Sequence, residues 1–112
     1  MNTQKKYVHF LIICFSVFFL CAPFSLASAK PVTHTVSITG MKFVPDDLEI
    51  AVGDTVIWKN EDIVPHTVTD KSVWNSGTLL SDKNYKFKFK RSGSYSYSCQ
   101  FHPLMTARIT VK

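Results

Sequence analysis

Cysteine is scarce in this sequence. Its 112 residues include three cysteines, and two of these, Cys14 and Cys21, fall in an apolar stretch near the N-terminus. Small exported domains usually carry cysteines in pairs, because disulfides compensate for a small hydrophobic core. The single cysteine that remains, Cys99, excludes an internal disulfide framework. An unpaired thiol in an oxidising compartment needs another form of protection, and a bound metal ion would provide it.

Helical periodicity, sequence repeats and a strong charge excess are also missing. No segment places apolar residues at the 3.6-residue spacing of an amphipathic helix, which argues against a helical fold. The formal net charge is +5, and it falls to +3 once Lys5 and Lys6 are removed with the N-terminal segment. A dispersed charge of this size is too small for nucleic-acid binding, but it suits weak docking to an acidic protein surface.

The N-terminal segment has the three parts of a secretory signal peptide. Lys5 and Lys6 form its basic start, 10–22 is almost entirely apolar, and Ala27-Ser28-Ala29 is a small-residue cleavage site. We therefore expect a signal peptide over 1–29, a mature domain over 30–112 and a periplasmic location. The alternative is an uncleaved membrane anchor, since the apolar stretch approaches the roughly 17 residues of a short membrane span.

Alternation of apolar and polar residues predicts strands along most of the mature domain. Aromatic residues alternate with lysines over 85–90, and tyrosines alternate with serines over 94–98, ahead of Cys99. Seven or so short strands separated by turn signals predict an all-β fold, a two-sheet antiparallel sandwich. Cys99 should then point into the core at a strand end. His34 lies in the first strand and is expected at the core or rim, away from any metal.

Four potential metal ligands gather in two segments. Cys99, His102 and Met105 follow one another at intervals of three, and His66 comes directly after Pro65. Two imidazoles, one thiolate and one thioether are the ligand set of a blue-copper site, whereas closed zinc sites use four Cys or His ligands. The sequence thus predicts one type 1 copper ion. It predicts no catalytic residues and no other cofactor, because no carboxylate pair or independently oriented base accompanies Cys99.

Beyond these ligands, essentially the whole mature chain resembles the cupredoxins, in particular the plastocyanin and amicyanin type with the shortest ligand loop. The resemblance lies in 41–45, 52–58, 65–67, 74–77, 93–99 and the loop that follows. It implies an eight-stranded Greek-key sandwich with copper bound by His66, Cys99, His102 and Met105. It further implies a monomeric, soluble periplasmic electron carrier that cycles between Cu(II) and Cu(I) and serves redox partner proteins such as a cytochrome, a dehydrogenase or an oxidase. In such proteins the second histidine, here His102, is the partly exposed ligand through which electrons leave.

Two residues depart from the pattern of this family. Many relatives have Asn after the first ligand histidine, where its side chain ties the two ligand-bearing segments together; here Thr67 could do so only with a shorter reach. Amicyanin-like loops usually carry Pro two residues after the cysteine, and Phe101 stands there instead. Phe101 has a backbone N–H that Pro lacks. We hypothesise that it donates to the Cys99 sulfur and favours Cu(I).

A second function remains open from sequence alone. A periplasmic copper chaperone or sequestration protein would also be exported and would also bind copper. Such proteins tend to present several exposed methionines or histidines, whereas Met41 is the one methionine of the mature domain besides Met105. The residue pattern therefore favours electron transfer over copper handling.

Overall fold

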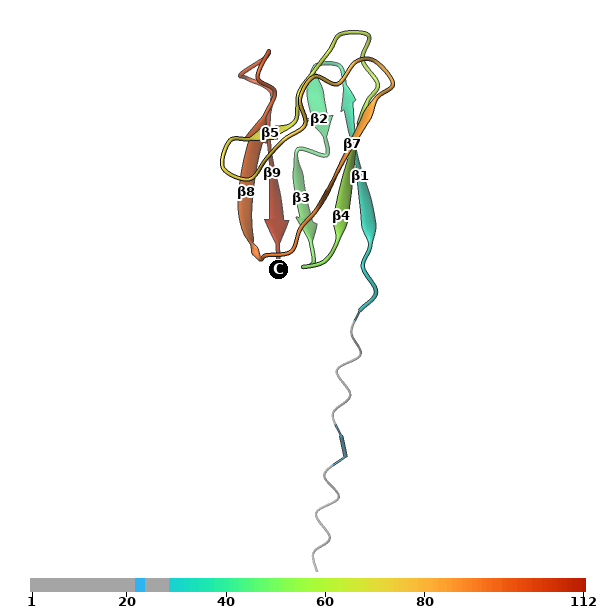
Figure 1. Ribbon diagram of the computed structural model, residues 1–112, viewed down its shortest axis with the longest axis vertical. Helices are drawn as coiled ribbons and strands as arrows, with labels where there is room; N and C mark the ends of the chain where they lie inside the picture. The colour runs from blue at the N-terminus through green and yellow to red at the C-terminus, as the bar shows by residue number, and fades with distance from the viewer. Residues whose placement is uncertain (1–21, 24–28) are drawn as a thin grey trace, which may run out of the picture.

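The fold was examined in a computed structural model that describes residues 22–23 and 29–112 (Figure 1). The predicted signal peptide over 1–29 lies outside these residues, apart from positions 22, 23 and 29. None of the described residues forms a helix with the length and apolar character needed to cross a bilayer. The described chain forms nine strands: β1 (Thr33–Thr39), β2 (Lys42–Val44), β3 (Asp47–Ile50), β4 (Thr55–Asn60), β5 (Thr69–Asp70), β6 (Trp74–Asn75), β7 (Asn84–Lys88), β8 (Gly93–Ser98) and β9 (Thr106–Val111).

The strands pack as two sheets, which confirms the predicted all-β sandwich. One sheet has the order β2-β1-β4-β7 and the other β3-β9-β8-β5-β6. Most neighbouring strands are antiparallel, but β1 pairs with β4, and β3 with β9, in parallel. Parallel neighbours need a crossover, and here the chain leaves β2 for the second sheet at β3 before it returns at β4. The purely antiparallel pairing expected from sequence is thus modified at one position in each sheet.

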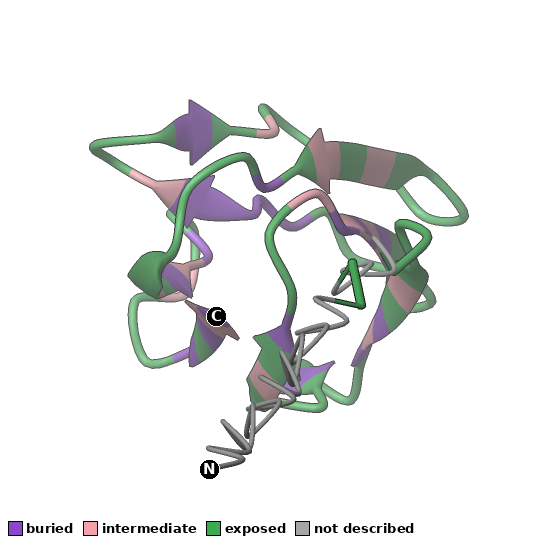
Figure 2. Ribbon diagram, turned by 90° about the horizontal axis from the view of Figure 1, so that it is seen from below, coloured by how far each residue is buried: buried purple, intermediate pink, exposed green. Residues whose placement is uncertain are grey.

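Alternate residues of each strand face the space between the sheets. Along β9 exposed and buried residues alternate, with Ala107, Ile109 and Val111 inside, and Figure 2 shows this banding along several strands. Trp58 of β4 lies fully buried in this core, and its indole Nε1–H donates to the Tyr97 hydroxyl at 3.1 Å. Burial raises the pKa of Tyr97. A dense aromatic core holds the two sheets at a fixed separation and provides a rigid base for the strand ends.

The N-terminal end of β1 is fixed by a buried carboxylate. The Asp54 side chain accepts hydrogen bonds from the backbone N–H groups of Val32 and Ala51, and its Oδ2 lies 2.8 Å from Nε2 of His34. The bond with His34, followed by those from the two backbone groups, lowers the pKa of Asp54 from 3.8 to about 2. His34 therefore has a structural partner, in agreement with its predicted place at the rim.

Candidate metal centre

The loop 99–105 carries three of the four predicted ligands and lies at the end of the sandwich opposite the C-terminus (Figure 1). It begins where β8 ends and stops where β9 starts. Its backbone is closed by three hydrogen bonds: Cys99 N–H to Met105 O at 3.1 Å, His102 N–H to Cys99 O at 3.3 Å and Met105 N–H to His102 O at 2.8 Å. These bonds link the backbones of all three residues to one another, so the loop has a defined shape without any ligand.

His66 reaches the same end from a different part of the chain. A two-way backbone bridge joins it to Leu79, with His66 N–H donating to Leu79 O at 3.1 Å and Leu79 N–H to His66 O at 2.7 Å. Its imidazole is completely buried. The bridge orients His66 toward the loop, as the sequence requires if the two segments are to share one ion.

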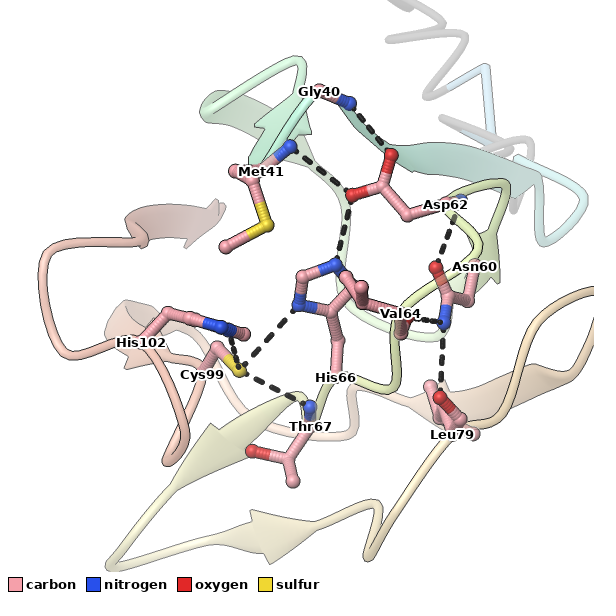
Figure 3. A network of polar contacts seen from close by, with 10 residues as sticks. All are labelled: Gly40, Met41, Asn60, Asp62, Val64, His66, Thr67, Leu79, Cys99 and His102. Carbon is pink, nitrogen blue, oxygen red and sulfur yellow. Dashed lines mark hydrogen bonds and ion pairs between the residues drawn. The ribbon is translucent and has the colours of Figure 1, made fainter.

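Three of the predicted ligands meet at one point. Cys99 Sγ lies 3.7 Å from His66 Nδ1 and 3.6 Å from His102 Nδ1, and the three potential ligand atoms all lie within 4.8 Å of one another. Cys99 and His66 are fully buried, whereas His102 is partly exposed. One sulfur and two imidazole nitrogens thus face a common centre (Figure 3). His102 is the member of the three that solvent partly reaches.

Met105 occupies a different kind of position. Its side chain is buried in the hydrophobic core cluster, and its backbone is tied to Cys99 and His102 at the base of the loop. A thioether in an apolar setting suits a weak, soft axial ligand. The role of Met105 as the fourth ligand stays a prediction that its placement in the loop supports.

Thr67 joins the two ligand-bearing segments in spite of its short side chain. Its Oγ1 accepts a hydrogen bond from the Gln100 N–H at 2.8 Å, and its own backbone N–H donates to Cys99 Sγ at 3.3 Å. The Thr67 side chain also accepts from the Thr69 hydroxyl at 3.1 Å. The Thr67 side chain, although shorter than the Asn of many relatives, is therefore long enough to link the two segments, because the backbone of Gln100 comes close to it.

The expected hydrogen bond from Phe101 to the thiolate is not found among the described residues. Cys99 Sγ receives its backbone donor from Thr67, on the other segment, and not from the residue two positions further along the loop. The first turn of the loop is closed instead by His102 N–H on the Cys99 carbonyl. Phe101 contributes a half-exposed ring beside the site, with 51% of its surface accessible.

Asp62 forms a second layer behind His66 that the sequence did not reveal. One carboxylate oxygen, Oδ2, lies 2.8 Å from His66 Nε2 and also accepts from the Met41 N–H at 3.1 Å, while Oδ1 accepts from the Gly40 N–H at 2.8 Å (Figure 3). Burial alone would raise the pKa of Asp62, but the hydrogen bonds from Met41, His66 and Gly40 outweigh it and lower this pKa. No local sequence signal marks this contact, since it depends on how the segment after β4 folds back.

Asn60 keeps this segment folded. Its side-chain Oδ1 accepts from the Asp62 N–H at 3.0 Å, and its Nδ2 donates to the carbonyls of Val64 at 3.0 Å and Leu79 at 2.9 Å. Asn60 is itself buried. A single amide thus holds Asp62, the approach to His66 and the bridging residue Leu79 in one arrangement.

Exposed apolar side chains lie in the loops of this end. Leu104 is 98% and Ile63 93% exposed, and Leu80 and Phe101 are more than half exposed. They belong to the ligand loop, the segment before His66 and the residue after its bridging partner. Two of these exposed apolar residues, Phe101 and Leu104, therefore stand in the same loop as the partly exposed His102.

The donor set fits copper better than other metals. A buried cysteine sulfur and two imidazoles that face it through Nδ1 correspond to the His₂Cys part of the donor set that copper electron-transfer sites use. Hydrogen bonds to the sulfur and to the second nitrogen of a ligand histidine are the outer contacts that orient such ligands. Both contacts are present here: the Thr67 N–H donates to the Cys99 sulfur, and His66 Nε2 is hydrogen-bonded to Asp62.

Comparison with known proteins identifies the family of this chain. The family model of the cupredoxin-like domain matches residues 10–111. The amicyanin-alpha of Methylorubrum extorquens is 35% identical over 83 residues, which cover 69% of this chain and 70% of that protein, and the amicyanin of Paracoccus denitrificans is 29% identical over 97 residues, covering 81% and 74%. The solved Cu(I) structure of a methionine-to-glutamine amicyanin variant superposes with a TM-score of 0.69 at 28% identity, covering 71% of this chain and 82% of that one. The chain belongs to the cupredoxin family.

Proposed function

We propose that this protein is a type 1 blue-copper electron carrier in which His66, Cys99, His102 and Met105 bind one copper ion. The observation that carries the proposal is the convergence of one thiol and two imidazole nitrogens within 4.8 Å, in a site fixed by backbone hydrogen bonds. The similarity to amicyanins supports copper as the metal. Bound copper would supply a one-electron couple between Cu(II) and Cu(I).

The protein's own contribution is a site that changes little between the two oxidation states. The ligand loop is closed by its own backbone bonds, Thr67 ties it to the His66 segment, and the aromatic core holds both sheets beneath. Ligands held this firmly need little rearrangement when the charge of the metal changes. A preorganised site of this kind favours rapid electron transfer over catalysis, and we propose no enzymatic reaction.

Electrons would enter and leave at His102. This imidazole is the partly exposed member of the donor set, while Cys99 and His66 are buried. The exposed Phe101 and Leu104 side chains belong to the same loop, before and after His102 in the sequence. An apolar rim allows a partner to dock briefly with little cost of desolvating charged groups. A cytochrome, dehydrogenase or oxidase is the class of redox partner that we propose.

Export follows from the N-terminal sequence. We propose that 1–29 is cleaved as a signal peptide and that the domain 30–112 works in the periplasm. The single cysteine of that domain is then the buried ligand Cys99, so metal binding protects it from oxidation. The retained-anchor alternative would leave the same domain tethered to the membrane.

Visible absorption of the copper-loaded protein tests this function. We expect Cu(II) to produce an intense blue thiolate band that a reductant bleaches reversibly, and Cys99→Ser to lose the band. Ser94→Ala serves as the control, because it changes an exposed side chain of β8, the strand that leads to Cys99, at a position outside the ligand loop and the Asp62 network. Tight Cu(II) binding without a thiolate band would contradict electron transfer and support the sequestration alternative, which binds copper without needing that geometry.

A further inference from the structure

The contact between Asp62 and His66 does more than complete a hydrogen-bond network. His66 is fully buried, and the Asp62 side chain is only 15% exposed, with Oδ2 2.8 Å from His66 Nε2. A carboxylate that already accepts hydrogen bonds from the Gly40 and Met41 N–H groups has acceptor character only. The proton between Asp62 and His66 therefore resides on Nε2. The other nitrogen, Nδ1, keeps its lone pair, and it is this nitrogen that faces Cys99 Sγ at 3.7 Å.

We propose that Asp62 is a positioning residue that fixes the tautomer of His66 with Nδ1 free for the metal, and that its negative charge favours Cu(II) over Cu(I). The second half rests on the proposed function, while the first concerns the metal-free protein. The electrostatic effect follows from sign, since a nearby anion stabilises the more highly charged oxidation state. At 15% exposure, water screens the carboxylate only partly.

The surroundings of Asp62 are built to hold its carboxylate in this place. Gly40 and Met41, at the hairpin between β1 and β2, both have left-handed backbones, with φ of 57° and 61°. Consecutive residues in such a turn point their N–H groups to one side and form a concave anion site. A left-handed backbone is unusual for Met41, and its N–H donates to the same Oδ2 that contacts His66. From the other direction, Asn60 fixes the Asp62 backbone.

A variant that removes the charge of Asp62 but keeps the shape of its side chain separates this positioning role from simple packing. In Asp62→Asn the side chain can present either an oxygen or an amino group to His66, so the tautomer is no longer dictated. Loss of such outer contacts typically weakens metal binding about 10- to 100-fold. We expect the loss for Cu(II) to exceed that for Cu(I), and a tenfold difference between the two corresponds to a rise in reduction potential of about 59 mV.

The decisive control is the neighbouring acid. Glu61→Gln removes the same charge one residue away, but Glu61 is exposed. Within the described part of the chain its side chain accepts a single hydrogen bond, from the Ser37 hydroxyl at 3.2 Å. We expect this variant to keep the wild-type potential. Asp62→Glu restores the charge on a longer side chain and should recover part of the shift.

Two measurements test the proposal, and the first needs neither copper nor a variant. Nitrogen-15 NMR of the metal-free wild type at about pH 8.5, above the ordinary histidine pKa of about 6.5, should show His66 protonated on Nε2 and not on Nδ1. The second is the reduction potential of the copper forms of Asp62→Asn, Asp62→Glu and Glu61→Gln.

Each outcome has a distinct meaning. A His66 protonated on Nδ1 in the metal-free protein would overturn the assignment even if Asp62→Asn failed to fold. Equal potentials for Asp62→Asn and the wild type, in a protein that shows the blue band, would overturn the electrostatic role alone. Absence of that band from the wild type would instead refute the proposed function and leave the NMR test of the tautomer standing.

Discussion

Replacing Thr67 by Val should loosen the joint between the two ligand-bearing segments without changing a proposed ligand. The Thr67 side chain is 1% exposed, and Val nearly matches its shape. The change removes the acceptor that holds the Gln100 N–H at 2.8 Å. The backbone donor from residue 67 to Cys99 Sγ stays in place, so the effect isolates one hydrogen bond.

The magnitude follows from what is left unpaired. The Thr69 hydroxyl, which also donates to Thr67, retains Asn75 Oδ1 at 3.2 Å as a second partner. Only the Gln100 N–H loses its acceptor, and an unsatisfied buried donor costs about 1–3 kcal/mol. This N–H is partly buried, so water reaches it in part, and we expect about 1–2 kcal/mol. For a domain of this size that corresponds to a melting temperature lower by about 4–16 °C.

Urea unfolding of the metal-free protein measures this loss directly, with the free energy of unfolding compared at equal slope. Thr67→Ser keeps the hydroxyl and should recover most of the difference, apart from the lost methyl group. Thr106→Val, at an exposed position on β9, is the matched control for the change of residue type. If Thr67→Val unfolds within about 0.5 kcal/mol of the wild type, a level typical of neutral surface changes, the argument that Thr67 ties the segments is refuted.

Two further predictions concern the scaffold away from the metal. The folded pKa of Asp54, about 2, lies below the ordinary 3.8, so the contribution of its carboxylate to stability is present above about pH 4 and disappears as pH falls toward 2. Urea unfolding of the metal-free protein across this pH range should show the loss of stability. Asp54→Asn should flatten the dependence of the free energy of unfolding on pH. Tyr97→Phe leaves the buried Trp58 indole N–H without its partner and should cost about 1–3 kcal/mol in thermal unfolding.

Both have internal controls. Asp47 forms an exposed ion pair with Arg108 at 2.9 Å, and Asp47→Asn should leave the acid part of the pH profile as in the wild type. An Asp54→Asn profile as steep as the wild type would show that other carboxyl groups dominate. For the core, Tyr95→Phe removes a hydroxyl that bonds a backbone carbonyl at the exposed edge, and it should cost less than Tyr97→Phe. Equal losses would contradict the ranking by burial.

Sequence periodicity predicted the longer strands well because one face of each is buried. The alternation before Cys99 corresponds to β8, and along β9 the apolar residues likewise lie inside. Two short strands, β2 and β6, were not predicted, since two or three residues cannot display a period of two. The alternation of Thr67, Val68 and Thr69 predicts a short strand directly after His66, but pairing begins only at Thr69. The N–H groups of Thr67 and Val68 donate instead to the side chains of Cys99 and Ser76.

The site likewise contains some residues that local sequence spacing identifies and others that only the pairing of distant strands brings together. Cys99, His102 and Met105 could be recognised from spacing, because a loop of seven residues keeps them close whatever the rest of the fold does. Asp62 could not, because its partner Gly40 stands 22 residues away and is brought near by the pairing of β1 with β4. The donor to Cys99 has the same origin: local sequence points to Phe101, whereas the N–H that donates belongs to Thr67, 32 residues away along the chain but adjacent in the folded sandwich. Local sequence therefore identifies the proposed metal ligands, whereas the groups that orient them and adjust their charge are supplied by the pairing of distant strands.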